Sequence, residues 1–432
     1  MPRWRNWAGN QTCTPDVIAQ PSTEAQLVQL VQRVADRGGR LRPAGSGHSF
    51  TPLVGSDDVV VDLSRYSGVL SVDTTSLTVT VQAGIPLRRL NTELAARGLA
   101  LENLGDIAYQ TVSGATQTAT HGTGVRFGNL ASRIVAMRLV DGAGQVVECS
   151  ASVEPEIFTA ARVGIGALGL VSTVQIQCVP AFNLHAVEGA EPVDELLEHI
   201  DDEVDGHDHF EFFWIPNTRW ALTKRNRRTD EPVRPRARWR AFRDDVVYDN
   251  MLFGLMCHVG RVRNDLIPRV ARALPSKGRA DYIDASYKVF ASPRLVHFVE
   301  MEYAIPRLAL PEALNRVRAH VAALGVHISF PVEVRFVAGD DIPLSTASGR
   351  DTAYIAVHVF RGTPYEEYFR GVERIMDDYE GRPHWGKLHF HDASTLAPRY
   401  PGWAAAQAVR ARMDPLGTFS TPAMERVLGP VG

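Results

Sequence analysis

The chain has 432 residues, of which 45% are hydrophobic and 22% are charged, and its formal net charge is −3. This length exceeds one ordinary hydrophobic core and predicts two domains or more, while the composition is that of a soluble globular protein. The small net charge excludes a strong electrostatic field for nucleic acid or for an anionic membrane surface.

The chain carries four cysteines at scattered positions, and no two of them have the spacing of a metal site or a redox pair. We therefore expect reduced thiols and a cytoplasmic protein. The N-terminal residues contain no apolar run typical of a secretory signal. The uncharged stretch 163–184 is long enough to span a membrane, but Val174, Ile176 and Cys178 alternate with polar residues, which indicates a strand.

The first elements along the chain mix helices and strands without regular alternation. Thr23 is predicted to cap a helix whose apolar residues recur at helical spacing until Gly38. Hairpins are predicted over 69–81 and 134–149, and another helix follows Pro86. This mixture predicts an α+β fold for about the first 180 residues.

A glycine-rich segment, Gly45-Ser46-Gly47-His48, follows a predicted strand over Leu41–Ala44. Glycines so close together let the backbone turn tightly and bring its N–H groups against an anion such as a diphosphate. A second glycine-rich cluster, Thr120–Gly124, also carries a histidine. Either cluster alone is as consistent with a tight turn, beside a histidine whose hydrogen bonds are made within the protein, as with an anion site. Both clusters together indicate one extended cofactor.

Residues 164–169 match the GxGxxG fingerprint of dinucleotide-binding folds. That fingerprint requires a strand before it and a helix after it. Here a helix is predicted before the motif and a strand after it, so we do not expect a nicotinamide dinucleotide site.

The stretch 224–243 is rich in arginine but is interrupted by acidic residues and prolines. We predict a solvated surface loop here, with Trp239 and Phe242 anchoring the helix that follows. A nucleic-acid site would need a wider basic face with aromatic platforms.

A predicted strand over 328–336 places Glu333 and Arg335 on one face and its apolar residues on the other. Such a pair either holds a polar substrate, with Arg335 keeping Glu333 ionised, or is an ordinary structural ion pair. In the next strand, over 354–360, His358 lies on an otherwise apolar face and is by itself typical of a core histidine.

Three histidines, His384, His389 and His391, surround Lys387, and the last two would share one face of a strand. No nearby carboxylate or cysteine completes a convincing ligand set, so we expect no metal. Lys387 is the better clue, because a lysine held against an isoalloxazine ring stabilises negative charge that develops on it.

A series of motifs resembles, in order, the aldonolactone and alditol oxidases of the vanillyl-alcohol-oxidase flavoprotein superfamily, from about Trp4 to the C-terminus. The resemblance implies an α+β fold with a two-part FAD-binding domain at 1–180. It also implies a mixed α/β substrate domain over the flavin at 181–385 and a C-terminal segment at 386–432 that returns to the FAD-binding domain. The motifs are Gly45–Phe50, Thr120–Gly124, Leu168–Val171, Glu333-x-Arg335, Gly349–Thr352 and His384–Lys387.

The resemblance also implies FAD bound covalently through His48 and a small residue, Gly105, that leaves space for oxygen beside the flavin. The residues implied to be catalytic are Glu333, Arg335, Lys387, Asp106 and His358. The residues implied to bind the cofactor are Ala44, Gly45, Ser46, Gly47, His48, Ser49, Gly105, Asp106, Ser113, Gly114, Thr118, His121, Gly122, Val171 and Lys387.

The activity that the resemblance implies is oxidation of a sugar 1,4-lactone of the gulono or arabinono type, by hydride transfer to flavin N5. Oxygen or a redox carrier would take up the electrons, and the protein would be a monomer or a weak oligomer. The alternatives are an alditol oxidase that produces an aldose and hydrogen peroxide, and a flavin-carrying binding protein without turnover. Alditol oxidases have serine in place of Asp106 and threonine in place of Phe360, which favours the lactone. Either Asp106 or Glu333 would accept the hydroxyl proton.

Overall fold

The computed structural model has the predicted α+β architecture, with parallel and antiparallel sheets and helices packed on them. The prediction that Trp239 and Phe242 anchor a helix lies outside the residues that the structure describes. Those described residues are 1–237, 253–269, 280–292 and 296–431.

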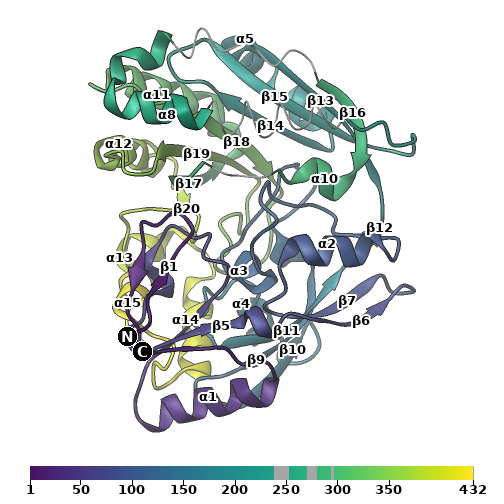
Figure 1. Ribbon diagram of the computed structural model, residues 1–432, viewed down its shortest axis with the longest axis vertical. Coiled ribbons are helices and arrows are strands. Elements are labelled where there is room, and N and C mark those ends of the chain that lie inside the picture. The colour runs from purple at the N-terminus through teal and green to yellow at the C-terminus, as the bar shows by residue number, and fades with distance from the viewer. Residues whose placement is uncertain (238–252, 270–279, 293–295, 432) are drawn as a thin grey trace.

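The structure has two hydrophobic cores, and most of the segments that form them belong to two halves that lie one above the other in Figure 1. The lower core draws mostly on residues 27–186 and 385–428, with Tyr282, Val289, Phe290, Ile342 and Leu344 added from the middle of the chain. The upper core draws almost entirely on residues 193–376. On this basis we propose domain boundaries at about residues 180 and 385, as expected from the sequence.

The lower half contains a parallel sheet, in the order β3 (Val17–Ala19), β5 (Val59–Asp62) and β4 (Leu41–Ala44). Helix α1 (Glu24–Asp36) begins where the Thr23 hydroxyl accepts a hydrogen bond from the backbone N–H of Gln26. It ends before Gly38, whose φ of 64° suits glycine. The predicted helix and its limits are therefore confirmed.

A five-stranded antiparallel sheet completes the lower half, and both predicted hairpins belong to it. Three short helices flank this region: α2 (Leu87–Ala95), α3 (Val112–Gln117) and α4 (Pro155–Ala161). A short pair, β8 (Leu99–Ala100) with β12 (Val179–Pro180), lies near the boundary between the halves. The five strands, in spatial order, are β10 (Val146–Ser150), β9 (Ile134–Val140), β11 (Leu170–Gln177), β7 (Thr78–Gln82) and β6 (Val69–Asp73).

The GxGxxG segment lies between helix α4 and strand β11, in the order that excludes a dinucleotide fingerprint. The buried Arg42 guanidinium donates hydrogen bonds to the carbonyl oxygens of Ile165 and Gly166, at 2.9 and 2.7 Å. It also donates to the Phe419 carbonyl at 2.9 Å, and burial lowers the pKa of Arg42 to about 9. The turn therefore binds an internal cation and ties strand β4 to the C-terminal segment.

The upper half is built on an eight-stranded antiparallel sheet. Helices α5 (Val193–Glu198), α6 (Ile200–Gly206), α11 (Leu310–Ala323) and α12 (Glu366–Asp377) lie in this half with it (Figure 1). The strands, in spatial order, are β16 (Ala280–Ala285), β13 (Asn183–Pro192), β15 (Trp220–Thr229), β14 (His209–Trp214), β18 (Val332–Val337), β19 (Thr352–Phe360), β17 (Phe298–Pro306) and β20 (Arg382–Pro383).

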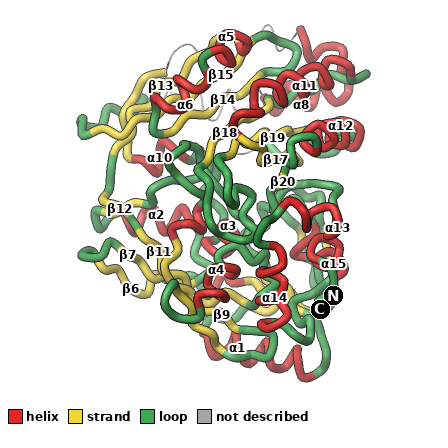
Figure 2. Tube along the Cα trace, turned by 180° about the vertical axis from the view of Figure 1, so that it is seen from behind, coloured by secondary structure: helices red, strands yellow, loops and turns green. Residues whose placement is uncertain are grey.

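The last segment of the chain returns to the lower half, where helix α14 (Trp403–Met413) packs on α4. Helices α13 (Ala393–Leu396) and α15 (Pro422–Leu428) contact each other beside the short N-terminal pair β1 (Trp4–Arg5) and β2 (Thr12–Cys13). The view from behind in Figure 2 shows the same return and places the two chain ends side by side.

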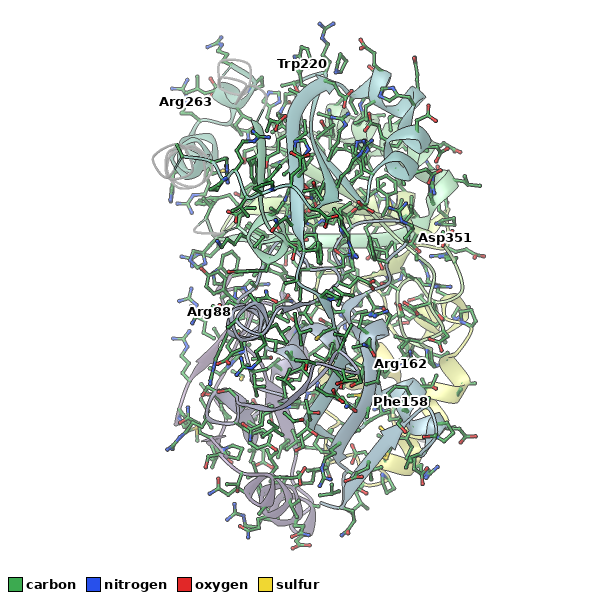
Figure 3. All side chains as sticks on the ribbon, turned by 90° about the vertical axis from the view of Figure 1, so that its right-hand side faces the viewer. Arg88, Phe158, Arg162, Trp220, Arg263 and Asp351 are labelled. Atoms are coloured by element: carbon green, nitrogen blue, oxygen red, sulfur yellow. The ribbon has the colours of Figure 1, made fainter. Side chains whose placement is uncertain are left out.

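The segment between β18 and β19 also contacts the lower half. Arg162, which directly follows α4, lies over the Phe158 ring at 5.1 Å and places its Nη2 2.9 Å from Asp341 Oδ1. Figure 3 shows Arg162 and Phe158 together in the lower half and Asp351 higher up, at the end of this segment. The two halves are thus joined by more than the covalent crossings of the chain.

Three local predictions from the sequence differ from the structure. Lys224–Thr229 is the end of strand β15 and not a loop, because it pairs with β13 along its length. The strand predicted over 328–336 begins only at Val332. His389 and His391 lie in an irregular segment and not on a strand. In the described part of the chain no helix is long and apolar enough to cross a membrane, and all four cysteines are unpaired.

Candidate active site

One face of the upper sheet is charged although it is buried. Strand alternation sends Val332, Val334 and Phe336 into the upper core, as predicted, and turns Glu333 and Arg335 toward the lower half. Strands β14, β17 and β19 repeat the pattern on the same face. The inward-facing charged or titratable residues are Glu211, Glu300, Glu302, Glu333, Arg335 and His358, and each is at most 7% exposed.

Arg335 is the centre of the first group of contacts. Its Nε donates to Glu211 Oε2 at 2.8 Å, and its Nη2 lies 2.5 Å from Glu333 Oε1 and 3.6 Å from Asp106 Oδ1. Burial raises the pKa of Glu333 to about 7, and the negative charges of Asp106 and Glu211 raise it further. Arg335 lowers this pKa but does not outweigh burial, so it does not keep Glu333 fully ionised as predicted. A carboxyl group with this pKa is suited to exchange a proton near neutral pH.

A second group of contacts joins Lys387 and His358 through one carboxylate. Lys387 Nζ donates to Glu300 Oε2, and His358 Nε2 lies 3.5 Å from Glu300 Oε1 and 4.0 Å from Glu333 Oε2. Burial opposes the charge on Lys387, but Glu300 outweighs it and raises the pKa of Lys387. The predicted catalytic residues therefore meet in one cluster, although they come from two strands and two loops.

The glycine-rich loop 45–49 faces the start of helix α3 across a narrow gap. A Cβ on Gly45 would lie 2.7 Å from Thr111 Oγ1 and 3.6 Å from Gly114 Cα, so a side chain here would fill the gap. A cavity of about 520 Å³ opens beside the loop, and Ala44, Gly45, Ser46 and Thr111 contribute to its lining. This shape suits a phosphate-linked ligand held by backbone N–H groups.

His48 stands at the other end of the same loop. Its Nδ1 is buried and has no hydrogen-bond partner, and its ring centre lies 5.5 Å from that of Trp7 and 6.2 Å from that of Tyr109. Burial, with a further contribution from Lys387, lowers the pKa of His48 to about 4. The imidazole is therefore neutral at physiological pH and keeps a nitrogen lone pair available, as attachment to a flavin requires.

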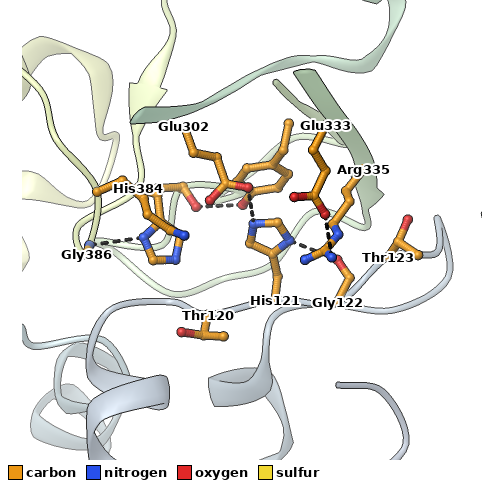
Figure 4. A network of polar contacts seen from close by, with 12 residues as sticks. Thr120, His121, Gly122, Thr123, Glu302, Glu333, Arg335, His384 and Gly386 are labelled. Atoms are coloured by element: carbon orange, nitrogen blue, oxygen red, sulfur yellow. Dashed lines mark hydrogen bonds and ion pairs between the residues drawn. The ribbon is translucent and has the colours of Figure 1, made fainter. Parts of the chain in front are cut away.

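His121, from the second glycine-rich cluster, contacts the sheet. Its Nδ1 donates to the Gly122 carbonyl at 2.8 Å, its Nε2 lies 3.3 Å from Glu302 Oε1, and its ring stacks on Tyr354 at 3.7 Å (Figure 4). Burial disfavours the Glu302 carboxylate, but the His121 ring outweighs this and lowers the pKa of Glu302. His121 thus joins the lower half to the upper sheet through its contacts with Glu302 and Tyr354.

His121, Glu302 and His384 each offer a ligand atom within 4.8 Å of the others, a spacing that suits a metal ion. However, His384 Nδ1 accepts the backbone N–H of Gly386 at 3.0 Å, so its Nε2 carries the proton. Metal binding through Nε2 would move that proton to Nδ1, against the Gly386 N–H. The arrangement therefore favours hydrogen bonding over metal ligation.

The remaining predicted residues lie around this centre. A Cβ on Gly105 would lie 3.1 Å from the His121 carbonyl, and one on Gly122 would lie 2.4 Å from the Leu104 carbonyl, so these segments pack closely. Phe360 lies two residues beyond His358, with its ring edge against His258 at 4.6 Å. The other residues predicted to bind the cofactor lie in or next to the glycine-rich loop, helix α3 or strand β11. They are Ala44, Gly47, Ser49, Ser113, Gly114, Thr118 and Val171.

Sequence reasoning missed three buried carboxylates, those of Glu211, Glu300 and Glu302. A signal was present, because Phe298–Pro306 alternates apolar residues with Glu300 and Glu302 as Val332–Val337 does with Glu333 and Arg335. The partners of these carboxylates are far apart in the sequence, so only the sheet pairing shows what they contact.

The fold and this site define an FAD-dependent oxidoreductase, and the comparisons with known proteins agree. Residues 15–150 match a family model described as an FAD binding domain. Residues 174–427 match the model of the D-arabinono-1,4-lactone oxidase family, to which the chain belongs.

Relatives cover nearly the whole chain. L-gulono-1,4-lactone dehydrogenase of Mycobacterium tuberculosis is 47% identical over 430 residues, which are 99% of this chain and 100% of that protein. L-gulonolactone oxidase of Bos taurus is 32% identical over 98% of both chains. Cholesterol oxidase from B. sterolicum has the same fold, with a TM-score of 0.83 at 18% identity, covering 99% of this chain and 96% of that one.

Proposed function

We propose that the protein oxidises a sugar 1,4-lactone of the gulono or arabinono type with FAD as the electron acceptor. The observation that carries this proposal is the buried cluster of Arg335, Glu333, Asp106 and His358, beside the loop that carries His48. The names of the relatives, among them L-gulono-1,4-lactone dehydrogenase and L-gulonolactone oxidase, support the substrate class.

The residues that would hold FAD are those of the loop 45–49, the start of α3 and the segment Gly105–Asp106. His48 would form the covalent bond to it, which its unpartnered Nδ1 supports. When bound, FAD supplies the acceptor for a hydride from the carbinol carbon of the lactone. A fixed cofactor and a buried site exclude water from the reacting atoms.

Within this site Glu333 accepts the hydroxyl proton, since burial has raised its pKa to about 7. Arg335 holds the lactone carbonyl and keeps the surrounding carboxylates in place. Lys387 supplies fixed positive charge for the electrons that arrive on the ring system. This assignment favours Glu333 over Asp106 as the proton acceptor.

A polyol is the second candidate substrate. Each hydroxyl of a polyol is both a donor and an acceptor and needs polar partners along the chain. The alditol oxidases that this chain resembles have threonine at the position of Phe360 and serine at the position of Asp106. A ring with one carbonyl suits the apolar Phe360 and the Arg335 guanidinium better.

The test is anaerobic mixing of the purified flavoprotein with candidate substrates while the absorbance of oxidised flavin is followed. Loss of that absorbance with gulono- or arabinono-1,4-lactone supports the proposal. Bleaching by polyols alone would support the alditol oxidase, and no bleaching by either class would support a binding protein without turnover.

A further inference from the structure

Strand β17 carries Glu300 and Glu302 on its inward face, and neither residue belongs to the set of catalytic residues described above. Their side chains are buried, with 4% and 5% exposure. Each contacts a different basic side chain: Glu300 accepts a hydrogen bond from Lys387, and Glu302 Oε1 lies 3.3 Å from His121 Nε2. A buried carboxylate is stable only when such partners compensate its loss of hydration.

Glu300 differs from Glu302 because its two oxygens serve two groups of the proposed active site. Oε2 accepts from Lys387 Nζ, and Oε1 lies 3.5 Å from His358 Nε2. We propose that Glu300 is a positioning residue that fixes Lys387 and His358 relative to each other. It would thereby link the fixed positive charge at the flavin to the imidazole beside Glu333. This inference rests on the proposed function for the roles of Lys387 and Glu333.

The hydrogen bonds of His358 define which way its ring faces. Nδ1 donates to the Pro331 carbonyl at 3.2 Å, so Nε2 is the nitrogen that faces the carboxylates of Glu300 and Glu333. The charged groups that act on His358 are Glu300 from β17, Glu333 from β18 and Lys387 from the segment after β20. Rings of Phe298 and Phe330 cover the remaining sides at 5.2 and 6.1 Å.

The protonation of His358 follows from these neighbours. Burial favours the neutral ring, but Glu300 outweighs it and raises the pKa of His358. The charged ring in turn lowers the pKa of Glu333, whose own burial raises it. Glu300 therefore acts on the proton acceptor through His358, without touching the substrate.

The chain offers a matched pair of variants. Glu300→Gln keeps the size of the side chain and removes its charge, and Glu302→Gln makes the same change two residues along the same strand. The His358 pKa is measured in the oxidised flavoprotein by NMR titration of ring-labelled histidine, with His358→Gln assigning the signal. This readout requires no substrate and no turnover.

We expect Glu300→Gln to lower the pKa of His358 by about one unit or more, as loss of an adjacent opposite charge does. We expect the pKa of His358 to be unchanged in Glu302→Gln, because Glu302 contacts His121 and not His358. The same Glu300→Gln variant should move the rise of flavin reduction with pH to higher pH, because Glu333 loses a neighbouring cation.

If Glu300→Gln does not fold, a second variant tests the same coupling between Lys387, Glu300 and His358. Lys387→Met removes the other partner of Glu300, and loss of this cation should raise the pKa of His358. An unchanged pKa of His358 in Glu300→Gln, or an equal shift in Glu302→Gln, would overturn the inference. Failure of lactones to reduce the flavin would count against the proposed function alone, because the titration does not depend on it.

Discussion

Arg335 Nη2 lies 3.6 Å from Asp106 Oδ1, and this contact joins the central strand β18 of the upper sheet to a loop of the lower half. The same guanidinium also binds Glu333 and Glu211. One cation thus holds three carboxylates that would otherwise repel one another at the proposed active site. Its removal should affect both chemistry and stability.

Arg335→Ala should slow anaerobic flavin reduction by a factor of ~10²–10³, as expected for loss of one preorganised electrostatic group. It should also lower the free energy of unfolding by about 3–5 kcal/mol, because it leaves buried carboxylates without their partner. Stopped-flow absorbance and thermal unfolding measure the two effects. Lys387→Met should slow reduction similarly, and unchanged reduction in both variants would make these ion pairs purely structural.

Flavin reduction should depend on pH through Glu333. Burial raises the pKa of this carboxyl group to about 7, and it accepts a proton only when ionised. The reduction rate should therefore fall as the pH drops through about 7 and level off above it. Glu333→Gln should abolish this dependence and reduce the rate ~10²–10³-fold. Asp106→Asn is the comparison: if it removes the dependence and Glu333→Gln does not, Asp106 is the proton acceptor.

His48 should carry the flavin covalently, because its buried Nδ1 has no partner within the protein. After denaturation in acid, flavin fluorescence should remain with the precipitated polypeptide. His48→Ala should release all of its flavin under the same treatment. His297→Ala is a matched control, since His297 also stacks on Trp7, at 4.6 Å, and should retain bound flavin. Release of all flavin from the parent protein would contradict the attachment.

Gly45 should be required for cofactor binding. In Gly45→Ala the new Cβ would lie 2.7 Å from Thr111 Oγ1, closer than such atoms approach, and it would fill the gap beside α3. We expect a clear drop in the flavin-to-protein absorbance ratio of the purified variant. Gly189→Ala, where a Cβ has no heavy atom within 4 Å, should bind flavin as the parent does. Equal flavin content in both variants would show that the loop does not enclose the cofactor.

Local patterns in the sequence predicted the glycine loops, the hairpins and the shared face of Glu333 and Arg335, because each depends on neighbouring residues. The role of Glu300 could not be predicted, because its partners are distant in the sequence. His358 follows it by 58 residues and Lys387 by 87 residues. The error at His389 has a similar cause: the backbone N–H of Phe390 donates to the Glu373 side chain from α12 instead of to a neighbouring strand. Local alternation therefore predicts the face on which a residue lies, whereas pairing between distant segments determines which residues it contacts.

The most direct test of the proposed function is the rate of anaerobic flavin reduction by L-gulono-1,4-lactone compared with xylitol or sorbitol at equal concentration. A polyol hydroxyl left against Phe360 without a partner costs about 1–3 kcal/mol, so the lactone should react at least about tenfold faster. The double variant Phe360→Thr with Asp106→Ser should move the ratio toward the polyols. Equal or faster reduction by the polyols in the parent protein would contradict the lactone assignment.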